Sequence, residues 1–168
     1  MSREFNRYVE KQFALRMKSF NLEPAKASGP IAWPGERCFR TLGGGTVCWI
    51  CVFPDYKGRN EFNVELAWSH HGEYPASQTS RPTILAVPPA CFSSLAEGFV
   101  RLGNLANPPR DSWGLDTVES QLATLTAAQV ASIAGPLVDD AIHVIEFAGL
   151  SLIAQAKLAR SAFLENAA

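Results

Sequence analysis

The sequence predicts a single α+β domain over residues 1–168, in which an antiparallel meander of three or four strands is packed by an N-terminal helix and a C-terminal helical group. Three observations predict it. The first twenty residues have helical periodicity, residues 37–69 contain strand patterns separated by turn residues, and helix-start signals recur after residue 88. No internal repeat or linker divides the chain, and its length suits one domain with a real core.

An amphipathic helix is predicted over residues 3–20. Its apolar residues recur every three or four positions and therefore share one face: Phe5, Val9, Phe13, Met17 and Phe20. Residues 21–35 contain three prolines and two glycines, so they are predicted to be a connecting loop.

The strand patterns begin at Arg37. Residues 37–42 lead into Gly43-Gly44-Gly45, which suits a tight hairpin turn, and then into residues 47–53, which are apolar throughout and predict a central strand covered on both faces. Residues 62–69 alternate with period two and predict a third strand. A shorter fourth strand is predicted at residues 83–87.

The rest of the chain is predicted to be helical. Pro88-Pro89 opens a helix that ends near Gly103, with Phe92, Leu95, Phe99 and Leu102 on one face. Capping-box patterns at 116–119 and 126–129 predict two helix starts. Gly135-Pro136 is expected to end or kink the second of these helices, and Asp139 and Asp140 to begin another, which continues to about Asn166 with a break at Gly149. The apolar positions of this last region favour core packing over a dimer contact: Phe147, Leu150, Ile153, Ala156 and Phe163.

Composition limits the classes of partner. The 15 Lys and Arg nearly balance the 16 Asp and Glu, so a formal net charge of −1 gives no general attraction to nucleic acid or to an anionic membrane. Residues 141–156 are too short and too polar to span a bilayer, and no signal peptide is visible. The sequence therefore predicts a cytoplasmic protein with no membrane partner, whose four cysteines are reduced and buried.

Three groups of residues were candidates for chemistry. Cys48 and Cys51 have C-x-x-C spacing, but within a strand they point to opposite faces and are predicted to be structural. His70 and His71 follow a strand end, where binding residues are often found, although adjacent side chains on an extended chain diverge. His143 lies near Asp139 and Glu146 and is predicted to be half-buried. We expect no metal site and no cofactor.

The segment from Arg101 to Trp113 combines unusual residue types. Arg101-Leu102-Gly103-Asn104-Leu105 is followed, after a Pro-Pro turn, by Asp111-Ser112-Trp113. An Arg101–Asp111 ion pair closing a corner over the indole of Trp113 is the preferred interpretation, and a recognition surface is the alternative.

On these motifs the chain resembles the bacterial domain-of-unknown-function family 4304. The resemblance depends most on Arg101-Leu102-Gly103-x-Leu105 with Asp111-x-Trp113, and also on Cys38-Phe39-Arg40, on Phe62–Leu66 and on Gly135–Asp139. It implies a bacterial α+β domain with an antiparallel sheet and no established activity. Similar small domains include immunity proteins that mask toxins, which is an analogy and not a property of these residues.

Three functional hypotheses follow. The leading one is a non-enzymatic protein-interaction domain, immunity-like in type, binding another protein near Arg101, Asp111 and Trp113. The alternative is a small-ligand binder or enzyme with a cleft near His70, His71 and Arg101. The weakest is a nucleic-acid binder that stacks bases on exposed Trp49 and Trp68.

Overall fold

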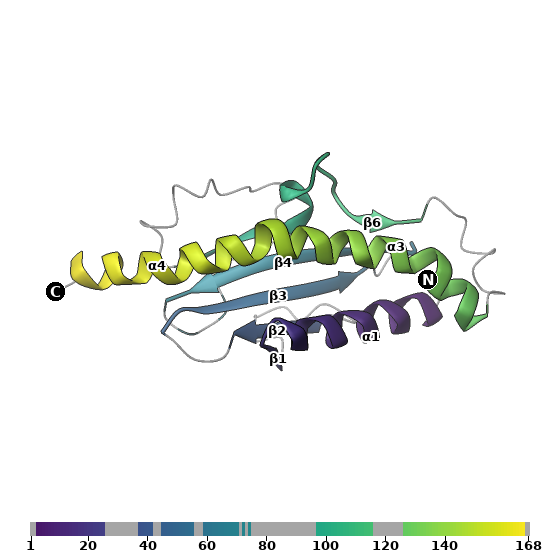
Figure 1. Ribbon diagram of the computed structural model, residues 1–168, viewed down its shortest axis with the longest axis horizontal. Coiled ribbons are helices and arrows are strands. Elements are labelled where there is room, and N and C mark those ends of the chain that lie inside the picture. Colours follow the sequence, from purple (N-terminus) through teal and green to yellow (C-terminus); the bar gives the residue numbers. More distant parts are fainter. Residues whose placement is uncertain are drawn as a thin grey trace.

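In the computed structural model, the residues described are 3–25, 37–41, 45–55, 59–70, 72, 74, 97–115 and 126–166. They form two layers: an antiparallel sheet and, against one of its faces, a short N-terminal helix beside one long C-terminal helical rod (Figure 1). The α+β prediction is therefore confirmed, although the described residues already supply six strands to the sheet instead of three or four.

The elements follow one another along the chain in a simple order. They are α1 (Arg3–Ser19), β1 (Leu22–Ala25), β2 (Arg37–Thr41), β3 (Val47–Pro54), β4 (Glu61–Ser69), β5 (Glu97–Arg101), the 3-10 turn η2 (Leu102–Leu105), β6 (Trp113–Gly114), α3 (Ala127–Val144), the π-helical turn η3 (Ile145–Gly149) and α4 (Leu150–Asn166). The strands lie in the order β1-β2-β3-β4-β5, every pairing is antiparallel, and β6 also pairs with β4.

Helix α1 forms as its periodicity predicted. Phe5, Val9, Phe13 and Met17 are all buried against the sheet and α3. Asn21, with a φ of 58°, follows the helix end in the left-handed conformation that asparagine tolerates. This reversal sends the chain directly into β1.

Strand β1 corrects the prediction that residues 21–35 are all loop. Pro24 lies within the strand, and a proline argues against a central strand because it has no N–H to donate. Among the described strands β1 pairs with β2 alone, so it is an edge strand, a position where proline is tolerated.

The central hairpin β3–β4 confirms the strand predictions. Val47 pairs with Ser69 and Pro54 with Phe62, and nearly all of β3 is buried on both faces. The alternating side chains Phe62, Val64, Leu66 and Trp68 lie in the core under the helices. Trp49 and Trp68 are 2% and 0% exposed, so neither presents a ring on which a nucleic-acid base could stack.

Strand β5 replaces part of the helix predicted before Gly103. Over residues 97–101 the chain pairs with β4, so Val100 faces the helices whereas Phe99 packs in a second cluster on the opposite face. A helix would have placed Phe99 and Leu102 on one face. The spacing of Phe92, Leu95, Phe99 and Leu102 fits only the helical period, so pairing with the edge of β4 overrode the local pattern at residues 97–101. The rest of that predicted helix (residues 88–96), the predicted strand at 83–87 and the helix start at 116–119 lie outside the described residues.

The C-terminal helices are continuous, so α3 does not end at Pro136 and no new helix begins at Asp139. A kink was the other outcome predicted at Gly135-Pro136, and it is compatible with Figure 1, in which the first turns of α3 lie at an angle to the rest of the rod. The capping box at Thr126 is present, with Thr126 and Gln129 each bonded to the other's backbone N–H. The helix then passes through Pro136, and Asp139 and Asp140 lie in its interior. The break predicted at Gly149 is instead a π-helical turn that ends there, after which α4 begins directly. Of the described residues, no helix has both the length and the apolar character needed to cross a membrane.

The cysteines correct a further prediction. Cys38 and Cys51, directly opposite each other on β2 and β3, form a disulfide instead of remaining reduced. They belong to the second cluster, whereas Cys48 faces the helices as a buried free thiol. The prediction that Cys48 and Cys51 point to opposite faces is thus confirmed. Cys91 lies outside the described residues.

Burial of Cys48 predicts a pH dependence of stability. Desolvation raises the pKa of its thiol from 9.0 to about 12, with Lys157 acting in the opposite direction. Between these values the unfolded chain has lost the proton and the folded chain keeps it, so the free energy of unfolding falls as pH rises, by up to about 1.4 kcal/mol per pH unit. Urea unfolding of the wild type and Cys48→Ala between pH 8 and 10.5 should show a steeper fall in the wild type. Equal slopes would contradict this assignment.

Candidate functional site

The candidate site is built where the chain leaves and rejoins one edge of β4. β5 pairs with residues 65–69 of β4 and β6 pairs with residues 61–62, so both use the same edge. Residues 102–112 between them leave the sheet and pass beside α3. The loop closes on Gly103, whose carbonyl accepts from the N–H groups of Ala106 (3.2 Å) and Arg110 (3.0 Å).

Trp113 anchors the return of this loop. Its side chain is 1% exposed and stacks on Phe62, with ring centroids 5.8 Å apart and planes 13° apart. The indole N–H donates to Asp140 Oδ2 at 2.6 Å, and the same oxygen accepts from Arg110 at 2.7 Å. The Arg110 guanidinium also lies 5.9 Å from the centre of the indole ring. Trp113, Asp140 and Arg110 therefore tie the loop to the C-terminal half of α3.

This corner corrects the predicted Arg101–Asp111 ion pair. Asp111 is exposed, and Arg101 lies opposite Glu65 on the face of the sheet away from the helices, because Val100 and Leu102 on either side of it face toward them. Trp113 faces the helices. The strand alternation thus separates Arg101 from Trp113. The carboxylate that binds both Trp113 and Arg110 is Asp140 of α3, far away in sequence.

The structure does not bring His70 and Arg101, two residues of the predicted cleft, together. His70 follows the end of β4 and contacts Thr46, with 2.9 Å between Nδ1 and Oγ1, whereas Arg101 is in register with Glu65. At about 3.4 Å per residue, the five steps from Glu65 to His70 separate these positions by roughly 17 Å. His71 lies outside the described residues.

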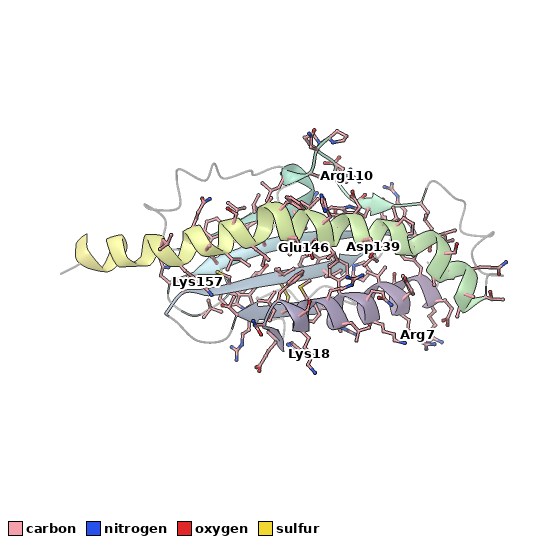
Figure 2. All side chains as sticks on the ribbon, viewed as in Figure 1. Arg7, Lys18, Arg110, Asp139, Glu146 and Lys157 are labelled. Atoms are coloured by element: carbon pink, nitrogen blue, oxygen red, sulfur yellow. A yellow bond between two sulfur atoms is a disulfide. The ribbon has the colours of Figure 1, made fainter. Side chains whose placement is uncertain are left out.

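A groove of about 260 Å³ lies beside the Arg110–Asp140 pair, between the loop and the helical rod. The described residues that line it come from residues 105–110 on one side and from α3 and η3 on the other: Leu105, Ala106, Asn107, Arg110, Asp140, His143, Val144, Phe147 and Ala148. The Arg110–Asp140 pair gives the groove a polar part, and its other walls are largely apolar. Figure 2 shows Arg110 on the side of the rod where the loop passes and Asp139 toward α1, where it pairs with Arg16 at 3.2 Å.

Phe147 and His143 form the outer wall of this groove. Their rings lie 4.3 Å apart, and Phe147 is 74% exposed. This corrects the expectation that Phe147 packs in the core and that His143 is half-buried, since His143 is exposed as well. Ile153 and Ala156 are buried as expected, and nothing is described of the Phe163 side chain. Phe147 occurs in the π-helical turn, and such turns are frequent at functional sites.

The charged or titratable side chains in the described lining of the groove are Arg110, Asp140 and His143. Its described lining carries no hydroxyl, thiol or amine nucleophile, and Asp140 Oδ2 already accepts two hydrogen bonds. Across the described residues, no group of three or more His, Cys, Asp or Glu side chains is placed to hold a metal ion. Apolar walls with a few fixed polar groups are suited to binding.

Sequence reasoning missed Arg110, Asp140 and Phe147 as members of one site. Arg110 lies three residues before Trp113, so local spacing was an available signal for it. Asp140 and Phe147 lie near Arg110 only because the helix continues without a break past the loop. Comparison of the chain with protein-family models, with curated proteins and with solved structures found no match.

Proposed function

We propose that this chain is a non-enzymatic protein-interaction domain that binds through the outward face of its C-terminal rod. We call this surface the outer helix face: His143, Phe147, Ser151, Ala154 and Leu158, all exposed and three or four residues apart. The observation that carries the proposal is that Phe147 and Leu158 are each 74% exposed on this one face.

Large exposed apolar side chains on one helix face favour a protein contact. Each would lose its contact with water on docking, and aromatic residues are enriched at the energetic centres of interfaces. The groove beside Phe147 supplies a recess that a partner's side chain can enter, with Arg110 and Asp140 as its polar groups. This surface replaces the one predicted around Arg101, Asp111 and Trp113, where Trp113 is buried.

The proposal includes a bacterial origin, a cytoplasmic location and an immunity-like role, all of which depend on the resemblance to family 4304 and on the sequence signals above. Cytoplasmic thiols reduce most exposed disulfides. Cys38 and Cys51 are 4% and 0% exposed, so a reducing thiol can reach their disulfide only after the face of the sheet away from the helices has opened. Their burial makes the disulfide compatible with this location.

A photo-crosslinker tests the proposed surface. Benzoylphenylalanine placed at position 147 in the full chain, expressed in its native cell, should capture one protein at high yield. The same crosslinker at position 15 is the control, because Leu15 is also a large exposed side chain, at 59%, but lies on α1. Equal capture from both positions, or none from 147, would overturn the proposal.

A second candidate function is small-ligand binding in the groove itself. The observation that favours it is the convergence of Arg110, Asp140 and His143 on one recess of about 260 Å³, which lies near the small end of the range for ligand pockets. It is not the cleft predicted near His70, His71 and Arg101. Failure of position 147 to capture any protein would favour this function over the first.

A further inference from the structure

We infer that the partner of the outer helix face is a second copy of this chain, packed with the two rods antiparallel. This inference rests on the proposed function and names a second copy as the partner on this face, in place of the toxin that an immunity-like role would put there. Figure 1 shows the rod lying on the outside of the sheet, with α4 continuing past the ends of the strands, so another helix can approach it along its length.

The spacing of side chains on this face is symmetric under reversal. Phe147, Ser151, Ala154 and Leu158 are separated by four, three and four residues, so their sizes run large, small, small, large. When the face meets itself antiparallel, Phe147 of each copy lies against Leu158 of the other, and Ser151 lies against Ala154. The two small residues at the centre let the helix axes come close, and the two large ones cover the ends.

Charges beside this face select the antiparallel orientation. Glu146 and Lys157 are both exposed and, like Phe147 and Leu158, are eleven residues apart. In Figure 2 they lie on the same rod, Glu146 near its middle and Lys157 toward the C-terminal end. Because Glu146 and Lys157 lie on the same flank of this face, an antiparallel pair brings each Glu146 near Lys157 of the other copy. A parallel pair in register puts these flanks on opposite sides of the contact and forms no such ion pair.

The size of the contact predicts a reversible dimer. Residues 143–158 span about four helical turns, and a single helix–helix contact of that length falls below the roughly 1,200–2,000 Å² buried in stable interfaces. We therefore expect monomer and dimer to exchange, with the dimer population rising with chain concentration.

Charge reversal tests the inference on the full chain. We expect Glu146→Lys and Lys157→Glu each to raise the dimer Kd about tenfold, because each creates two like-charged contacts in a symmetric pair, and the double variant to return it to within about threefold of wild type. Ala154→Arg at the centre should abolish dimerisation. Lys18→Glu is the matched control, since it makes the same charge change at an exposed site on α1 and should leave Kd unchanged. Sedimentation velocity over a range of concentrations gives the Kd values, and circular dichroism checks the fold.

Two outcomes overturn the inference. One is a wild-type chain that sediments as a monomer up to about 1 mM, the concentration at which even a 4 kcal/mol association would be visible. The other is a double variant no better than the single variants. The mass of the product crosslinked at position 147 distinguishes failure of this inference from failure of the proposed function. A product of twice the 18.3 kDa chain mass supports the second copy, whereas a product with another protein leaves the interaction function standing without it.

Discussion

Trp113→Ala is expected to lower the free energy of unfolding by about 3–5 kcal/mol, the range for removing a large buried aromatic side chain. The indole is 1% exposed, stacks on Phe62 and donates to Asp140. Its removal leaves a cavity under the rod and detaches the loop that carries Arg110. Urea denaturation followed by far-UV circular dichroism measures the change.

Trp113→Phe separates the ring from the hydrogen bond. Phenylalanine keeps most of the stacking on Phe62 but has no N–H for Asp140, which still accepts from Arg110. We expect a loss of about 1.5–3 kcal/mol, the usual range for a hydrogen bond to a charged group. If Trp113→Phe destabilised as much as Trp113→Ala, the hydrogen bond and not the packing would be the main contribution, contrary to this account.

Gly103→Ala is expected to lower the free energy of unfolding by about 1–3 kcal/mol, as overpacking of a close contact does. A Cβ at this position would overlap the backbone carbonyl oxygen of Arg110, and a backbone atom cannot move aside as a side-chain end can. The loop would have to open, weakening the bonds from Ala106 and Arg110 to the Gly103 carbonyl. The indole N–H resonance of Trp113 should therefore shift in this variant.

Gly149→Ala is the control for that prediction, because the same added methyl group should have the opposite effect. Gly149 lies inside the helical rod, where alanine is favoured over glycine by about 1 kcal/mol. The nearest atoms to its added Cβ are the ends of the Leu66 and Leu102 side chains, both at 3.5 Å, an ordinary van der Waals distance. A destabilised Gly149→Ala together with an unaffected Gly103→Ala would refute the assignment of the close contact.

The α+β class and the core faces of the main elements were readable from the sequence. Phe5, Val9, Phe13 and Met17 share a helix face whatever they pack against, and β3 was recognisable because an unbroken apolar run cannot face water on either side. The capping box at Thr126 was also predictable, since both of its partners lie within four residues. In each case the deciding interactions are local or depend only on burial.

Elements whose secondary structure depends on contacts with residues distant in sequence could not be predicted from the sequence. β1 contains a proline that its edge position tolerates, and β5 is a strand because β4 offers it an unpaired edge. The rod continues past Pro136 because packing against α1 and the sheet outweighs the loss of one backbone hydrogen bond. Local propensity is a weak guide wherever such tertiary contacts compete with it.

By itself, the sequence determined the fold class, the amphipathic faces and the segment around Trp113 as a corner of the fold. Only the tertiary structure decided which residues meet there: Arg110 and Asp140 instead of Arg101 and Asp111, with Phe147 beside them on the outside. The physical reason is that strand alternation sends Arg101 to the far face of the sheet, whereas an unbroken helix brings Asp140 and Phe147 past the loop. Neither consequence exists until the strands have paired and the rod has packed.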